Sequence, residues 1–140
     1  MVYFTGGSPE HLVETLKDSQ FFHALLAASN KGTVLAGSSA GAMVMGAMMR
    51  RPRSGGWVEA LSVVPRVAVL PHHEHRDQLE TSKELQETAP EGLVYLGIDA
   101  RTGCLGSPGN WRVVGFGAVT VYLGKEWQIF RAGERLPPGF

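Results

Sequence analysis

The sequence predicts an α/β fold of three layers, with a mostly parallel sheet flanked by helices and a C-terminal antiparallel β-meander. Short apolar runs alternate with amphipathic segments before residue 99, as strands and helices do in a largely parallel sheet. From residue 109 onward, alternating segments are separated by Gly and Lys turns, which is typical of antiparallel strands. The length of 140 residues and the 44% hydrophobic content fit one domain over residues 1–140.

The first elements are defined by the residues at their ends. The apolar run VYF at residues 2–4 predicts a buried strand that enters a tight turn at TGG. Ser8 is a typical N-cap, Pro9 suits the first helical position, and Glu10 adds negative charge to the first turn. A second helix is expected after Ser19, and it ends in the SNKG segment.

The later elements are predicted from apolar runs and the turn residues between them. They are, in chain order, a strand over 33–36, a helix over 41–49, a basic surface loop over 50–57, a strand over 66–70 stopped by Pro71, a helix over 77–88, a strand over 93–98, and alternating strands within 109–115, 118–124 and 126–134. In the helix over 77–88, Leu79 and Leu85 are expected to face inward.

The composition argues against several classes of protein. Thirteen basic and thirteen acidic residues cancel, so we expect neither nucleic acid nor an anionic membrane as a partner. The longest uncharged apolar stretch, residues 33–49, is shorter than a membrane span. Cys104 is the only cysteine, so no intrachain disulfide forms, and we expect a cytoplasmic protein without a signal peptide.

The segment GSSAG at residues 37–41 matches the G-x-S-x-G pattern between a predicted strand and a predicted helix. In a nucleophile elbow, small flanking residues let a strained turn close and expose the central hydroxyl. This frame assigns Ser39 as the nucleophile, gives the Ala40 N–H to the oxyanion hole, and leaves Ser38 at a variable position. A close-packed turn without chemistry explains the pattern equally well.

A reactive serine needs a general base, and His72 is the best-positioned histidine. It comes first after a buried strand, at the carboxyl edge where sites form in open α/β sheets. His11 and His23 fall in predicted surface helices, where a solvated role is expected. His73 and His75 offer an alternative as metal ligands, but too few further ligands accompany them for a closed zinc site. We therefore expect no metal, and a plain loop is the third alternative.

The FTGGSPE segment places Gly6 and Gly7 between a strand and a helix N-terminus, where successive N–H groups can face a phosphate or an oxyanion. This segment lacks the rest of a P-loop or dinucleotide fingerprint, so we expect no nucleotide cofactor. Arg50, Arg51 and Arg53 lie in the loop after the elbow helix. Arg51 is a candidate contact for an acidic substrate, although a solvated basic loop is the more ordinary interpretation.

Five segments, in this order, resemble the serine peptidase family that includes peptidase E and cyanophycinase: FTGGSPEHL, GSSAGA, LPHHEHR, LGIDARTGCL and IFRAGERL. The resemblance covers most of the chain and implies a flavodoxin-like sheet related to the class I glutamine amidotransferases. It implies that Ser39 is the nucleophile, that His72 is the general base, and that Gly7 and Ala40 donate to the oxyanion. It also implies hydrolysis of short peptides, including those with aspartate, through an acyl-enzyme and without a metal or cofactor.

One position departs from the family pattern. Where the family motif GIDE ends in a glutamate that orients the histidine, this chain has Ala100. Losing the orienting carboxylate of a serine protease costs about four powers of ten in turnover. Asp99 is the candidate substitute, and Glu59, Glu74 and Asp77 are further carboxylates that could reach. A catalytically impaired relative that acts by binding is therefore the alternative function.

The start of the chain is the second departure, because family members carry several strand–helix units before the Gly-Gly loop. The predicted sheet then has an uncovered edge, and we expect a homo-oligomer to cover it. A misassigned start codon or a cleaved chain explains the same difference. A further alternative is an amidotransferase-like or other α/β hydrolase on the same sheet, although true glutamine amidotransferases use a cysteine at the elbow and Cys104 is not at that position.

Overall fold

The computed structural model describes residues 1–139. The chain forms two compact units, Met1–Pro65 and Arg66–Phe140. Helices and strands occur in both units, so the predicted α/β class is confirmed. The single domain over residues 1–140 and its three-layer arrangement stay predictions. No helix among the described residues is long and apolar enough to cross a membrane.

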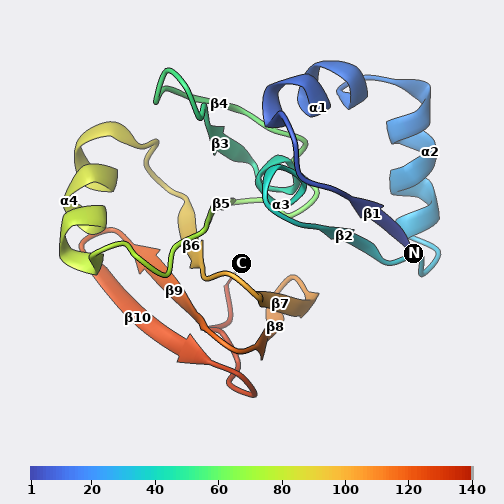
Figure 1. Cartoon of the computed structure of the whole chain (residues 1–140). Helices are drawn as coiled ribbons and strands as arrows, with labels where there is room; N and C mark the ends of the chain where they lie inside the picture. The colour runs from blue at the N-terminus through green and yellow to red at the C-terminus, as the bar shows by residue number, and fades with distance from the viewer. Residues whose placement is uncertain (140) are drawn as a thin grey trace. The chain divides into compact units, whose positions relative to one another are not determined.

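The first unit combines two small sheets with three helices (Figure 1). Its elements are β1 (Val2–Phe4), α1 (Pro9–Leu16), α2 (Gln20–Ser29), β2 (Leu35–Gly37), α3 (Ala40–Met45), β3 (Met48–Arg50) and β4 (Trp57–Glu59). β1 and β2 pair in parallel, with Phe4 opposite Gly37. β3 and β4 form an antiparallel hairpin whose connection, residues 51–56, is mostly exposed, as expected of the basic loop.

The first two helices begin where their cap residues predict. The Ser8 hydroxyl accepts a hydrogen bond from the His11 N–H at 3.3 Å, and Pro9 takes the first helical position. The Ser19 hydroxyl accepts the Phe22 N–H at 3.1 Å. Each cap satisfies an N–H that has no partner inside its helix, a contribution of about 1 kcal/mol.

The predicted helix over residues 41–49 is only partly correct. α3 ends at Met45, and Gly46 takes an extended conformation beyond it. Met48 and Met49 instead pair with β4, and Met49 is almost completely buried. Ala and Met favour helices, but this preference is weak, and pairing with β4 in the hairpin overrides it.

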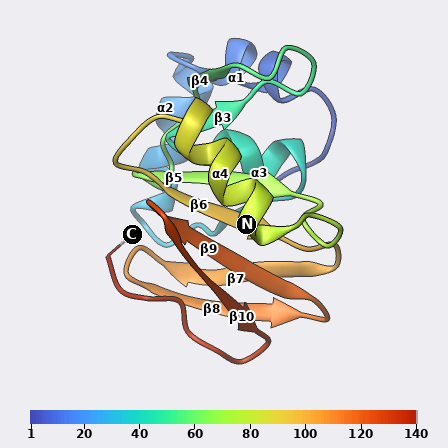
Figure 2. The same ribbon diagram turned by 90° about the vertical axis from the view of Figure 1, so that its left-hand side faces the viewer.

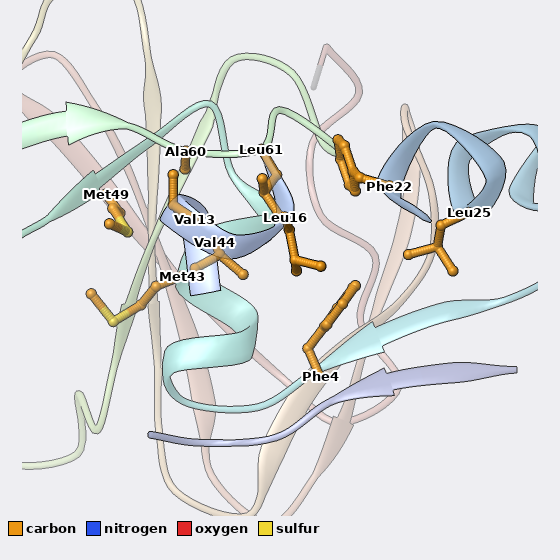
Figure 3. Close-up of a cluster of buried hydrophobic side chains, with 10 residues drawn as sticks. All are labelled: Phe4, Val13, Leu16, Phe22, Leu25, Met43, Val44, Met49, Ala60 and Leu61. Carbon is orange, nitrogen blue, oxygen red and sulfur yellow. The ribbon is translucent and has the colours of Figure 1, made fainter. Parts of the chain in front are cut away.

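A single apolar core lies inside the first unit (Figure 3). Its buried members come from helices, strands and the segment after β4: Phe4, Val13, Leu16, Phe22, Leu25, Met43, Val44, Met49, Ala60 and Leu61. Val44 of α3 is fully buried. Burying a side chain of this size is worth roughly 1.5–3 kcal/mol, so the core anchors the short helix that follows the GSSAG turn.

The second unit contains a four-stranded sheet, one helix and a separate hairpin (Figure 2). Its elements are β5 (Val67–Pro71), α4 (Gln78–Thr88), β6 (Val94–Ile98), β7 (Thr102–Ser107), β8 (Asn110–Gly115), β9 (Ala118–Leu123) and β10 (Glu126–Arg131). The sheet has the order β10-β9-β6-β5. β5 and β6 are parallel and are connected through α4, whereas β9 is antiparallel to both of its neighbours.

The predicted strand pairing needs two corrections. Among residues 1–139, the pairs inside the two units are mixed rather than mostly parallel, since only β1–β2 and β5–β6 are parallel. The C-terminal strands do not form one meander, because β7 pairs with β8, β9 pairs with β10, and β9 returns to β6. An alternating pattern predicts a strand and its buried face, but it does not name the partner strand.

Details of the segment around α4 also differ from expectation. Pro71, expected to stop the preceding strand, is the last residue of β5. Leu85 is buried as predicted, but Leu79 is 50% exposed. Leu79 and Leu85 are six residues apart, so with 3.6 residues per turn they point to different sides of α4, and the buried side is the one that carries Thr81, Ser82 and Leu85.

Candidate active site

The turn between β2 and α3 holds Ser39 in a rare backbone conformation. Its φ is +50° and its ψ is −115°, a combination that costs a non-glycine residue about 1–3 kcal/mol. The Ser39 hydroxyl does not cap α3, although the Ser39 carbonyl accepts the Met43 N–H at 3.0 Å. Ser39 is partly exposed, and Ser38 beside it is exposed. This is the geometry of a strained strand-to-helix turn.

Gly37 and Gly41 provide the space for this turn. A Cβ added at Gly37 would lie 2.4 Å from the carbonyl oxygen of Gly41, and one added at Gly41 would lie 2.1 Å from that of Phe4. Both distances are far below van der Waals contact, so no larger residue fits without moving backbone. A packing turn requires these glycines as much as an elbow does. The strain at Ser39 is the feature that packing alone does not require.

The Gly-Gly loop lies directly beside the serine. The Ser38 N–H donates to the Phe4 carbonyl at 3.0 Å, which ties the ends of β1 and β2 together. A Cβ added at Gly6 would lie 3.7 Å from the Cβ of Ser39. Gly7 follows with a φ of +137°, which side chains rarely adopt. Ala40 is the first residue of α3, where helical N–H groups have no partner inside the helix.

Arg51, the candidate contact for an acidic substrate, lies in the exposed connection between β3 and β4. Its Nε is 3.6 Å from Oε1 of Glu10 in the first turn of α1. The Arg51 and Glu10 side chains are 49% and 38% exposed, and ion pairs at the surface contribute only about 0–1 kcal/mol. A substrate carboxylate that binds Arg51 therefore has to displace only a weak ion pair with Glu10.

In the second unit, the parallel strands β5 and β6 end side by side, with Pro71 opposite Ile98. His72 follows β5, is exposed, and has a φ of +57°, in the left-handed region. Asp99 and Ala100 follow β6. The carboxyl ends of parallel strands meet at one edge of a sheet. His72, the predicted base, and the GIDA segment at residues 97–100 therefore belong to the same edge of this sheet.

His73 has a structural position that the sequence did not reveal. Its side chain is only 3% exposed, and its Nε2 lies 2.7 Å from the hydroxyl oxygen of Tyr122. A Cβ added at Gly97 would lie 2.4 Å from the His73 ring. Burial lowers the pKa of His73 and raises that of Tyr122, so both are neutral at neutral pH. The histidine doublet thus divides into an inward His73 and an exposed His72.

Three of the four carboxylates considered as substitutes for the family glutamate are engaged elsewhere. The partners are the Ala118 N–H for Asp99 at 2.8 Å, the Glu80 N–H for Asp77 at 2.9 Å, and Lys17 Nζ for Glu59 at 2.8 Å. Asp99 links β6 to β9, Asp77 caps α4, and Glu59 belongs to the first unit. None of these three contacts involves the backbone of Ala100, which stands where the family motif has its glutamate.

Glu74, the fourth carboxylate, contacts that backbone directly. Its Oε2 accepts the Ala100 N–H at 2.8 Å. The pKa of Glu74 lies below its usual value because its own backbone N–H and that of Ala100 donate to the carboxylate. The charges of His75 and His72 lower it further. An ionised carboxylate is therefore held next to Ala100 and within the electrostatic reach of His72.

Cys104 lies on β7 of the second unit and is not part of the GSSAG turn, which belongs to the first unit. Burial raises the pKa of Cys104 to about 11, so the group is a thiol rather than a nucleophilic thiolate at neutral pH. This argues against cysteine chemistry of the amidotransferase type. Within residues 1–139, no group of three or more His, Cys, Asp or Glu side chains is placed to hold a metal ion.

The structure places Gly6 beside Ser39 at the elbow and Arg51 in the exposed connection between β3 and β4. It places His72 and Asp99 at one edge of the second unit's sheet. The catalytic and binding roles stay predictions for all seven candidates: Gly6, Gly7, Ser39, Ala40, Arg51, His72 and Asp99. Sequence reasoning missed the His73–Tyr122 pair and the bond from Ala100 to Glu74. A tyrosine inside the apolar run AVTVYL was the available signal for the pair, because a buried hydroxyl needs a partner.

The chain is similar to known peptidases. The family model described as "Peptidase family S51" matches residues 1–102. Among solved structures, the chain is similar to one described as the crystal structure of a peptidase from an acI-B1 Actinobacterium. The two are 28% identical, with a TM-score of 0.79, and the match covers 96% of this chain and 58% of that chain. The present chain thus spans little more than half the length of that peptidase.

Proposed function

The chain belongs to peptidase family S51, and from this premise we propose that it is a serine hydrolase cleaving short peptides through an acyl-enzyme on Ser39. His72 is the proposed general base, and the N–H groups of Gly7 and Ala40 are the proposed oxyanion donors. These are the roles that the G-x-S-x-G frame, the histidine segment and the Gly-Gly loop predict.

In the proposed reaction, His72 takes the hydroxyl proton of Ser39 as Oγ bonds to the substrate carbonyl carbon. The N–H groups of Gly7 and Ala40 bind the oxygen, which becomes negatively charged in the tetrahedral intermediate. When the C–N bond breaks, His72 returns the proton to the leaving amine. Water then attacks the acyl-enzyme, His72 takes the water proton, and the acid product leaves as Ser39 regains its hydrogen.

The strained backbone of Ser39 is the observation that carries this proposal. A conformation that costs about 1–3 kcal/mol persists only when the surrounding structure enforces it, and such strain clusters at active sites. Here the close approach of Gly41 to Phe4 enforces the turn. The position of Gly6 beside Ser39 supports the oxyanion assignment, because it brings the Gly-Gly loop next to the serine.

The proposed substrates are dipeptides or other short peptides with an aspartate residue. The basic loop after β3 supports an acidic substrate, and Arg51 is the proposed contact. Replacing Arg51 by Ala is expected to raise KM for Asp-X dipeptides while leaving Ala-X dipeptides unaffected. Arg53→Ala, in the same exposed loop, is the matched control. Equal effects of the two variants on KM would remove Arg51 from substrate binding.

A fluorophosphonate probe and a panel of Asp-X dipeptides test the nucleophile. The wild type is expected to be labelled and to hydrolyse at least one dipeptide, whereas Ser39→Ala loses labelling and at least about a thousandfold in kcat/KM. Ser38→Ala is the control, because the neighbouring hydroxyl lies at the variable position of the pattern. Equal rates for the wild type and Ser39→Ala would exclude Ser39 from the mechanism.

Ala100 favours a second candidate function, a catalytically impaired relative that acts by binding. Without an orienting carboxylate, a histidine loses much of its efficiency as a base. Wild-type protein that resists the probe but binds Asp-containing dipeptides in calorimetry would favour this candidate. Probe labelling of Ser39 would contradict it.

We also propose that the protein forms a homo-oligomer through the surface around β1. Tyr3 is 52% exposed and Val34, just before β2, is 54% exposed. Exposed apolar side chains beside a strand pair favour association. Light scattering at micromolar concentration is expected to give a multiple of the chain mass, which Tyr3→Lys lowers and Leu105→Lys, at an exposed position on β7, does not. A stable wild-type monomer would contradict the proposal.

A further inference from the structure

The loop after β5 is fixed by its middle residue. The His73 N–H donates to the Ile98 carbonyl at 3.1 Å, and its ring binds the Tyr122 hydroxyl inside the sheet. Its neighbours on either side, His72 and Glu74, are both exposed. His73 is therefore held at two points. This fixes the backbone that carries the exposed side chains of His72 and Glu74.

The carboxylate of Glu74 is itself anchored. The bond from the Ala100 N–H at 2.8 Å fixes Oε2 at the end of β6. An ionised carboxylate has about four acceptor sites on its two oxygens, so this bond leaves capacity for an imidazole N–H. Pro71 lies opposite Ile98 where β5 and β6 end, so His72 and Ala100, whose N–H holds this carboxylate, leave the two strands at the same edge of the sheet. The charge of His72 contributes in a minor way to the lowered pKa of Glu74.

Asp99 is next to Ala100 in the sequence, but its carboxylate contacts other groups than the Glu74 carboxylate does. Its Oδ2 accepts the Ala118 N–H, and a Cβ added at Gly117 would lie 2.9 Å from the same oxygen. Burial lowers the pKa of His73, and the charge of Asp99 partly opposes that effect. The Asp99 carboxylate is therefore packed between β6 and β9 and acts on the inward histidine.

From these contacts we propose that Glu74 is the positioning residue of the peptidase site. Its carboxylate accepts one ring N–H of His72 and holds the imidazole in the tautomer and orientation that a general base needs. The backbone of Ala100 anchors the carboxylate at the position where the family glutamate is missing. This inference rests on the proposed roles of Ser39 and His72.

Glu74→Gln tests the inference, because glutamine keeps the shape and can accept the Ala100 N–H while losing the charge. With an Asp-X dipeptide as substrate, kcat is expected to fall about 100-fold or more with little change in KM. Glu91→Gln, an exposed carboxylate in the turn before β6, is expected to keep the wild-type kcat. Turnover by Glu74→Gln equal to that by Glu91→Gln would overturn the inference.

A second readout does not depend on turnover. In the Ser39→Ala background, ¹⁵N shifts of the His72 ring are expected to show one dominant neutral tautomer. Adding Glu74→Gln is expected to populate both tautomers, whereas adding Glu91→Gln is not. An unchanged tautomer ratio would overturn the inference even if the wild type hydrolyses peptides. If the wild type hydrolyses none, the proposed function fails, and the ring shifts alone still decide whether Glu74 positions His72.

Discussion

The carbonyl oxygen of Phe4 occupies the place where a side chain on Gly41 would begin. A Cβ added at Gly41 would lie 2.1 Å from that oxygen. The same oxygen accepts the Ser38 N–H at 3.0 Å, so it cannot move away without releasing the turn from β1. The contact between the end of β1 and the start of α3 therefore sets the shape of the elbow that carries Ser39.

Gly41→Ala is expected to lower the free energy of unfolding by about 1–3 kcal/mol or more, because the added methyl forces backbone apart. Urea unfolding measures the change. Gly56→Ala is the control, since nothing lies within 4 Å of a Cβ at that position, and its effect is expected to stay within about 0.5 kcal/mol. Equal stability of the two variants would show that the close approach to Phe4 is absent in solution.

Replacing Ser39 by Gly is expected to give a more stable protein than replacing it by Ala, by about 1 kcal/mol. Glycine adopts a φ of +50° without the penalty that alanine keeps. At ordinary positions the order is the reverse, because glycine loses more backbone entropy on folding. The same pair of substitutions at Ser38 provides that comparison. If Ser39→Ala is more stable than Ser39→Gly, the result would contradict a strained backbone at Ser39.

Gly97→Ala is expected to destabilise the second unit by about 1–3 kcal/mol, because its Cβ would lie 2.4 Å from the His73 ring. The displaced ring would also lose its bond to Tyr122. Gly103→Ala on β7 is the matched control, since the nearest atom to its Cβ, in Val114, is 4.0 Å away. Tyrosine fluorescence and urea midpoints that are the same for both variants would contradict this arrangement.

Stability is expected to fall as the pH drops below about 6.5, the ordinary pKa of histidine. Burial lowers the pKa of His73 in the folded chain. At a pH between this lowered pKa and 6.5, His73 is protonated in the unfolded chain but neutral in the folded chain. Each such proton changes the free energy of unfolding by at most about 1.4 kcal/mol per pH unit. His73→Gln is expected to flatten the dependence of the urea midpoint on pH, and His23→Gln, in an exposed position of α2, is expected to keep the wild-type slope. A wild-type slope in His73→Gln would assign the acid sensitivity to other groups.

The local parts of the fold were predictable. Ser8 and Ser19 cap the helices that their positions predict, and the apolar runs at residues 2–4 and 93–98 contain strands. The spacing in GSSAG predicted a turn with Ser39 at its centre, and that turn is present between β2 and α3. Each of these features depends on interactions within a few residues of the chain, which is why a single sequence can display them.

The sequence by itself thus determined where α1, α2, α4 and most strands lie and which serine stands at the centre of the GSSAG turn. Tertiary structure decided the rest. It ended α3 at Met45 through the pairing of Met49 with Val58 of β4, and it turned His73 inward through Gly97 and Tyr122. It also joined Glu74 to Ala100, 26 residues apart. These outcomes depend on which remote residues a strand or side chain meets, and neither local propensity nor spacing carries that information.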